Sequence, residues 1–164
     1  MTPPLIARTG FFKVLARPID FNKRFFGQPV LGNHKTWRGL IFGFFAGIII
    51  VFIQRWLYEI SFFQKISFLN YKSSDIFLFA ILISFGAVFG DLFFAFIKRR
   101  LNLKPGARFL PFDQTNYVIG AFIILEPFLK LDLSVWLTIF ISTFFLHIIF
   151  NRLGYLLGLH RNKW

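Results

Sequence analysis

The sequence predicts an all-α protein, a polytopic bundle of helices that cross a membrane. Of its 164 residues, 56% are hydrophobic and 27 are phenylalanine, and the mean hydropathy is +0.63. A water-soluble domain of this length does not have so apolar a composition. The apolar residues form solid runs and do not alternate with polar ones, which favours membrane helices over a β-barrel. The chain has no cysteine, which excludes disulfides and thiolate metal sites.

Four apolar runs predict four transmembrane helices, each of which needs about 20 residues. The runs cover residues 39–57, 76–97, 117–129 and 133–150. The third run is short and contains Glu126 and Pro127, and its helix can start near Thr115. The fourth run follows closely after Asp132, so the last two helices are expected to form a tight helical hairpin. Glycine pairs at 43 and 47 and at 86 and 90 predict close packing between helices.

The positive charges predict the orientation of these helices. The formal net charge is +12, and 15 of the 19 Lys and Arg residues lie in segments 1–38, 98–114 and 151–164. With four crossings, all three segments lie on the same side of the membrane. The positive-inside rule makes that side cytoplasmic. We therefore expect a multi-pass protein of the cell membrane whose basic loops and C-terminus face the cytoplasm.

A lone carboxylate, Asp91, lies inside the second apolar run and precedes the basic triplet 98–100. An ionised aspartate at mid-membrane costs roughly 3 kcal/mol even on the mildest scale. On a helix, Asp91 and Lys98 share a face about 10 Å apart. This pattern suits a metal ion and a polyphosphate at the membrane surface. The alternatives are a structural ion pair for Asp91 and a topological stop signal for the basic triplet.

Two further polar clusters are predicted on the same membrane side. Asp113 and Asn116 share a helix face where the third helix begins, although a helix N-cap with a polar first turn is the alternative. The segment 32–39 contains Lys35, Thr36 and Arg38 directly before the first helix. These side chains can bind phosphates or a nucleotide. Otherwise the segment is an ordinary aromatic and basic membrane flank.

The last helix contains His147 and Asn151 one turn apart, for which a buried polar pair between helices is the preferred interpretation. The chain has three histidines and no cysteine, and its sequence does not indicate a nucleophile–base pair. Phosphoryl or nucleotidyl transfer needs no covalent catalyst, because positioning, cations and a metal ion suffice. That requirement matches the residues predicted on the cytoplasmic side.

Taken in order, these segments resemble the CDP-archaeol synthase family, relatives of the CDP-diacylglycerol synthases. The first family motif resembles residues 18–21 and 32–39, and the second resembles Gly90-Asp91 with residues 98–100 and 104–106. Asp113-Gln114 resembles the third motif. His147, Asn151 and residues 155–164 resemble the C-terminal stretch. The resemblance covers nearly the whole chain.

The resemblance implies a CTP-dependent reaction assisted by Mg²⁺. The phosphate of a membrane lipid, an archaeal di-ether glycerol phosphate or phosphatidate, attacks the α-phosphate of CTP, and pyrophosphate leaves. Two positions depart from the family pattern: Ala95 replaces a serine, and Asn116 replaces the last aspartate of Asp-Gln-x-Asp. An amide oxygen can coordinate Mg²⁺ but supplies no charge, so weaker metal binding is expected.

The resemblance also implies roles for individual residues. The expected catalytic residues are Asp91, Lys98 and Asp113, and the expected Mg²⁺ ligands are Asp91, Asp113 and Asn116. The expected substrate-binding residues are Lys35, Thr36, Arg38, Arg99, Lys104 and Asn151. The expected partners are CTP, a lipid phosphate and the membrane, with no nucleic acid. The sequence leaves open the choice between ether and ester lipid, and the oligomeric state.

The alternative function is non-catalytic binding or transport of anionic lipids, because a basic surface at the membrane can bind lipid headgroups without catalysing a reaction. Asp91 argues against it, since a buried carboxylate repels phosphate unless a cation intervenes.

The resemblance also implies one more transmembrane helix before the first predicted one, since Thr2-Pro3-Pro4-Leu5 resembles the end of that helix. We therefore expect residues 1–164 to form a single cytidylyltransferase-like domain, truncated at its N-terminus, with four of the family's five helices.

Overall fold

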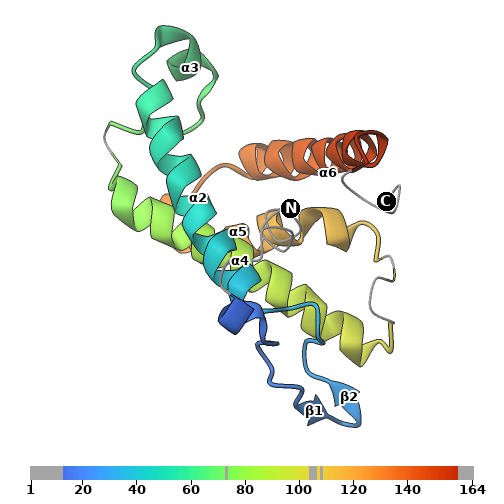
Figure 1. Cartoon of the computed structure of the whole chain (residues 1–164). Helices are drawn as coiled ribbons and strands as arrows, with labels where there is room; N and C mark the ends of the chain where they lie inside the picture. The colour runs from blue at the N-terminus through green and yellow to red at the C-terminus, as the bar shows by residue number, and fades with distance from the viewer. Residues whose placement is uncertain (1–12, 73, 104–106, 108, 159–164) are drawn as a thin grey trace.

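The computed structural model describes residues 13–72, 74–103, 107 and 109–158, and it is mostly helical (Figure 1). This confirms the predicted fold class. A short 3-10 helix, η1 (Lys13–Ala16), and a two-stranded hairpin precede the α-helices. The elements are, in order, β1 (Arg24–Phe25), β2 (Gln28–Pro29), α2 (Trp37–Leu57), α3 (Ser61–Ile66), α4 (Ile76–Arg100), α5 (Phe112–Leu129) and α6 (Leu133–Leu156).

Three of these helices, α2, α4 and α6, are long and apolar enough to cross a membrane. They correspond to the first, second and fourth predicted helices, and the chain is a multi-pass membrane protein. The third predicted helix is present as α5, which begins at Phe112, earlier than expected. The polar residues of its first turn, Asp113 among them, are compatible with a helix because acidic groups are favourable near a helix N-terminus. Among the described helices α5 is not one of the three candidate spans, so a fourth crossing stays a prediction.

Glycines bring the backbones of α4 and α5 into direct contact. The two helices lie side by side (Figure 1), and Gly90 packs against the carbonyl of Asn116. A Cβ atom added at Gly90 would lie 2.1 Å from that oxygen, and one added at Gly120 would lie 2.1 Å from the Gly86 oxygen. Gly47 of α2 approaches Ser84 of α4 in a similar way, with 2.5 Å between its added Cβ and the hydroxyl oxygen. These contacts set Asp91 beside α5 and below α2.

A polar contact inside the apolar core joins α5 to α6, which form the predicted helical hairpin. Trp136 Nε1 donates a hydrogen bond to Glu126 Oε2 at 2.7 Å. Trp136 packs with Ala121 and Leu125 in one buried cluster. Lys130 ends α5 in the left-handed conformation, and α6 begins at Leu133. The Glu126 carboxylate therefore has a hydrogen-bond donor within the bundle.

The segment before α2 is tied together by one buried carboxylate. The side chain of Asp20 accepts hydrogen bonds from the backbone N–H groups of Asn22 (3.0 Å), Leu31 (2.9 Å) and Gly32 (2.9 Å). Partial burial of Asp20 opposes its ionisation. The three amide donors outweigh that effect and lower the pKa of Asp20 below its ordinary value. Asp20 thus closes the base of the β1–β2 hairpin.

We predict that Asp20→Asn loosens this hairpin base by about 1–3 kcal/mol, because the amide cannot accept hydrogen bonds at both of its terminal atoms. The measurement is hydrogen exchange at the Leu31 and Gly32 amides, which should become faster in the variant. A lowered pKa means that the stabilisation is present above the unfolded pKa of about 3.9 and is lost as the pH falls through the lower folded pKa. The difference between variant and parent should therefore shrink in acid. Equal exchange rates at neutral pH would contradict the assignment.

Candidate functional site

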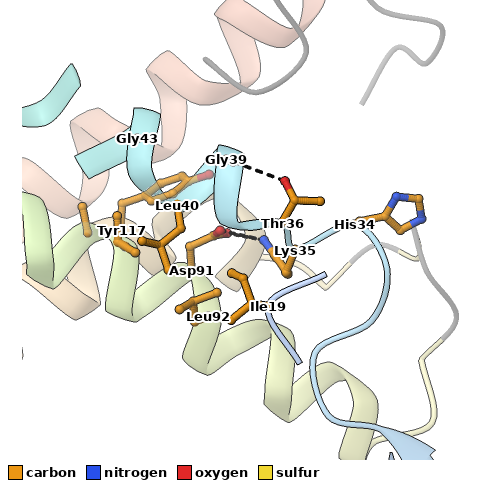
Figure 2. Close-up of a pocket in the computed structure, with 12 residues that line it drawn as sticks. Ile19, His34, Lys35, Thr36, Gly39, Leu40, Gly43, Asp91, Leu92 and Tyr117 are labelled. Carbon is orange, nitrogen blue, oxygen red and sulfur yellow. Dashed lines mark hydrogen bonds and ion pairs between the residues drawn. The ribbon is translucent and has the colours of Figure 1, made fainter. Parts of the chain in front are cut away.

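A cavity of about 200 Å³ lies where the segment before α2 meets α4 and α5 (Figure 2). One wall comes from the loop and the first turns of α2, the opposite wall comes from α4, and Tyr117 of α5 lines the cavity between them. Its polar side chains come from the loop, from Asp91 of α4 and from Tyr117 of α5. The lining residues are Ile19, His34, Lys35, Thr36, Gly39, Leu40, Gly43, Ala87, Val88, Asp91, Leu92 and Tyr117.

An ion pair between Lys35 and Asp91 is the central feature of this cavity. Figure 2 shows the two side chains pointing toward each other, and Lys35 Nζ lies 2.7 Å from both carboxylate oxygens of Asp91. Each side chain is 27% exposed. Backbone contacts hold the Lys35 segment in place, since the Ile19 N–H donates to the Lys35 carbonyl at 2.9 Å and Pro18 forms a β-bridge with Thr36. The ion pair that was the alternative explanation of Asp91 is therefore present, and it faces a cavity.

Asn116 completes the surroundings of Asp91 from the α5 side. Its side-chain amide donates to Asp91 Oδ1 at 3.3 Å, and its own oxygen accepts the Tyr117 N–H at 2.8 Å. Asn116 is 5% exposed, so the residue that replaces the expected aspartate lies in direct contact with Asp91. The close contact of Gly90 with the Asn116 backbone makes this pairing possible.

A second ion pair lies further along the contact between α4 and α5. Lys98 Nζ lies 2.9 Å from both carboxylate oxygens of Asp113, and it also donates to the Ala107 carbonyl at 2.6 Å. Asp113 accepts the Phe109 N–H at 2.9 Å. The N-cap of α5 is Pro111 and Asp113 lies in the first turn of that helix, so the polar first turn of the alternative is present, with Asp113 in it rather than at the N-cap. Lys98 and Asp113 do not line the cavity, and they organise the loop that leads into α5.

The remaining predicted site residues are distributed differently. Thr36 lines the cavity, but its hydroxyl accepts the Gly39 N–H at 3.2 Å and caps α2, while Arg38 lies in the first turn of α2. Arg99 is 9% exposed and donates to the Leu103 carbonyl, away from the cavity lining. Asn151 contacts His147 on its own helix at 3.1 Å. Lys104 lies outside the described residues.

Sequence reasoning missed Tyr117 as part of the site. In the sequence it is the first residue of an apolar run, and it directly follows Asn116. The structure places Tyr117 on the cavity lining with Asp91. Helical spacing is the sequence signal that could have indicated Tyr117, because this residue lies one helical turn after Asp113.

The donor groups near the cavity can be compared with the needs of a metal ion. Among the residues that the structure describes, no group of three or more His, Cys, Asp or Glu side chains forms a preassembled metal site. Mg²⁺ often takes only one or two carboxylates and completes its shell with water and substrate phosphates. Asp91 is a ligand of that sparse kind, and the Asn116 amide, whose nitrogen faces Asp91 and whose oxygen accepts the Tyr117 N–H, would have to turn its oxygen toward Asp91 to act as a second ligand. The Lys35 ammonium shows that a cation is already accommodated against this carboxylate.

Comparisons with known proteins show which family this chain belongs to. A sequence model of the family described as CarS-like, CDP-archaeol synthase, matches residues 8–164. CDP-archaeol synthases from Archaeoglobus fulgidus and Methanosarcina barkeri are 38% and 36% identical to this chain, over 90% of its length and 84% and 90% of theirs. The enzyme from Methanococcus aeolicus is 31% identical over 90% of this chain and 83% of its own. No solved structure matches the chain. With a family match over nearly all of its length, the chain belongs to the CDP-archaeol synthase family.

Proposed function

We propose that this protein is a CTP-dependent cytidylyltransferase of membrane-lipid synthesis. It transfers the cytidylyl group of CTP to the phosphate of a membrane lipid and releases pyrophosphate. The observation that carries the proposal is the Asp91–Lys35 pair, which faces a cavity beside a membrane helix in a chain similar over 90% of its length to proteins named CDP-archaeol synthase.

The proposed reaction is a single displacement at phosphorus. An oxygen of the lipid phosphate attacks the α-phosphorus of CTP, and the bond from that phosphorus to the oxygen bridging the β-phosphate breaks. The electron pair leaves with pyrophosphate. Such a reaction requires alignment of two anionic reactants and neutralisation of their charge, with no covalent intermediate. The Lys35 ammonium at the cavity suits both tasks.

Individual residues of this chain are proposed to bind the phosphates and Mg²⁺. Lys35 binds a phosphate of CTP or of the lipid, with Thr36 and Arg38 beside it at the start of α2. Mg²⁺, when bound, neutralises the triphosphate and makes pyrophosphate a better leaving group. Asp91 and the neighbouring Asn116 are proposed to hold it, and Asp113, which lies outside the cavity lining, is included as a ligand on the family resemblance. Binding of the metal to Asp91 would free the Lys35 ammonium for a phosphate.

Lys98 orients Asp113 through its ion pair. We include Arg99, Lys104 and Asn151 as substrate-binding residues on the family resemblance alone.

The lipid substrate in this proposal is an archaeal di-ether glycerol phosphate, because the relatives are named for archaeol. Phosphatidate is the competing substrate. The test is an assay of the purified protein in detergent with CTP labelled at the α-phosphate, Mg²⁺ and either lipid phosphate. We expect a labelled CDP-lipid with an equal amount of pyrophosphate, and loss of both with a chelator. Binding of the lipids without release of pyrophosphate would instead support a non-catalytic lipid-binding protein.

We predict that Asn116→Asp lowers the Mg²⁺ concentration needed for half-maximal activity. The added carboxylate would lie against Asp91, where two negative charges favour a divalent cation. The measurement is a Mg²⁺ titration of the cytidylyl transfer rate at fixed CTP. Asn116→Ala is the control, since it removes the amide without adding charge. An unchanged Mg²⁺ dependence in the aspartate variant would show that position 116 does not contact the metal.

We also propose that the site faces the cytoplasm, as the distribution of Lys and Arg predicts. The natural chain has no cysteine, so single cysteines report orientation without background. In right-side-out vesicles we expect an impermeant thiol reagent to label Lys72→Cys, in the loop before α4, and to spare Asn33→Cys until the vesicles are opened. Both positions are exposed. The reverse labelling pattern would place the site outside.

A further inference from the structure

The hairpin before α2 presents an aromatic and basic surface that the proposed reaction does not use. We define the hairpin surface as Phe21, Lys23, Arg24, Phe25 and Phe26. Its three aromatic side chains are 62%, 49% and 88% exposed, in chain order, and both basic residues are also exposed. An isolated protein in water does not gain from presenting three neighbouring phenylalanines.

The end of α4 fixes the hairpin surface at a definite level of the molecule. Arg100, the last residue of α4, donates to the carbonyls of Phe25, Gln28 (3.3 Å) and Pro29 (2.6 Å). Its guanidinium lies 5.3 Å from the Phe25 ring centre and 5.1 Å from that of Phe96. Figure 1 shows the hairpin beside the C-terminal end of α4. Phe96 lies one turn inside a helix long enough to span the membrane, so the hairpin lies beside the end of a candidate membrane span.

The hairpin is an ordered element with a fixed set of outward side chains. Arg24 pairs with Pro29 and Phe25 pairs with Gln28, while Asp20 closes the base. Phe21 and Phe26 both have φ of 49°, in the left-handed region that bulky residues rarely adopt. The fold thus holds large apolar side chains at turn positions where glycine or asparagine would be less strained.

We propose that the hairpin surface is an interfacial anchor that embeds in the lipid bilayer. Phe21 and Phe26 enter the boundary between headgroups and acyl chains, and Lys23 and Arg24 contact anionic headgroups. Aromatic residues favour this boundary, and basic residues beside it are attracted to anionic lipids. A lipid surface is favoured over a protein partner because the hairpin is held at the end of a membrane helix.

The anchor has a consequence for the cavity, although the inference does not depend on the proposed reaction. The hairpin continues directly into the segment that contains Lys35, and the Ile19–Lys35 and Pro18–Thr36 contacts join its two ends. Embedding the hairpin therefore holds Lys35 at the depth of the lipid headgroups. A phosphate on a membrane lipid lies at that depth without leaving the bilayer.

The test measures the depth of position 26 in vesicles. Phe26→Cys, labelled with an environment-sensitive fluorophore, is reconstituted into vesicles of phosphatidylglycerol and phosphatidylcholine. We expect a blue-shifted emission that is quenched by lipids brominated on their acyl chains and protected from aqueous iodide. Asn33→Cys, an exposed loop position on the same side, is the matched control and should show the opposite pattern. Phe21→Cys provides a second reporter if the first variant folds poorly.

The charge contribution is tested with the reporter at position 26 in place. Lys23→Glu with Arg24→Glu should shift the emission to the red and reduce lipid quenching in anionic vesicles, while Lys23→Arg with Arg24→Lys should not. High salt should act like the charge reversal, because exposed charges are screened. Iodide quenching at position 26 equal to that at position 33 would overturn the proposal. Protection from both quenchers would also overturn it, since a protein surface would then cover the hairpin.

Discussion

Replacing Asp91 with asparagine is expected to reduce cytidylyl transfer by at least about 100-fold, the effect of losing a key charge-stabilising group in an active site. Asparagine keeps the shape of the side chain but removes the charge that pairs with Lys35 and that is proposed to hold Mg²⁺. Insertion into the membrane should be unimpaired, because an uncharged residue is cheaper to bury there than a carboxylate. The measurement is the rate of CDP-lipid formation by purified, reconstituted variant protein.

A double variant separates the two roles that Asp91 can have. If Asp91 serves only to neutralise Lys35, then Asp91→Asn combined with Lys35→Met removes both members of the pair and should fold at least as well as either single variant. Removing one partner of this half-buried pair leaves the other charge without a counter-ion, whereas removing both does not. Activity should nevertheless stay lost if Asp91 binds the metal and Lys35 binds phosphate. Mg²⁺-dependent transfer that survives in Asp91→Asn would show that the carboxylate has a purely structural role.

Replacing Gly90 with alanine is expected to destabilise the protein by about 3 kcal/mol or more, at the upper end for overpacked sites. The new methyl group would meet the Asn116 carbonyl at 2.1 Å and the Gly120 Cα at 3.0 Å. Both are backbone atoms of α5, so no side-chain rotation can relieve the clash and the two helices must separate. The measurement is the thermal unfolding midpoint in detergent, together with the fraction of protein that elutes as a folded monodisperse peak.

Gly43→Ala is the matched control for this effect. Gly43 is also a membrane-helix glycine, but the nearest atom to an added Cβ is Val88 Cγ2 at 3.9 Å, an ordinary contact. Alanine is the better helix former by about 1 kcal/mol, so this variant should be as stable as the parent or more so. Equal losses in the two variants would show that the contact between α4 and α5 is looser than described.

Both predictions concern the same structural arrangement. The glycine contact between α4 and α5 sets Asn116 against Asp91, and the segment before α2 brings Lys35 over the same carboxylate. A clash at Gly90 should therefore disturb the site as well as the fold. Asp91→Asn should disturb the chemistry while the fold is retained. Comparing the two variants separates loss of folded protein from loss of catalysis.

The sequence by itself determined the helices, and it singled out Lys35, Thr36 and Asp91 among the residues that line the cavity. The backbone of a segment inside lipid must form its hydrogen bonds within the protein, so a long apolar run forms a helix. The length of the apolar runs is therefore enough to predict α2, α4 and α6. Asp91 could be singled out for a similar reason, because an isolated carboxylate in such a run needs a partner. The family match was also available from motifs in their order along the chain.

Only the tertiary structure decided which residues meet. Lys35 and Asp91 are 56 positions apart, and nothing local indicates that Lys35 rather than Lys98 pairs with Asp91. The pairing of Lys35 with Asp91 depends on two features. Glycine contacts set how closely α4 approaches α5, and the hydrogen bonds of Asp20 and Ile19 fold the segment before α2 back over α4. The β1–β2 hairpin was likewise not predicted, because its strands are two residues long and Arg100 stabilises them from another part of the chain. Helix formation is governed by residues that are neighbours in the sequence. The site is assembled by contacts between distant segments, and the spacing of those segments in the sequence does not indicate which contacts form.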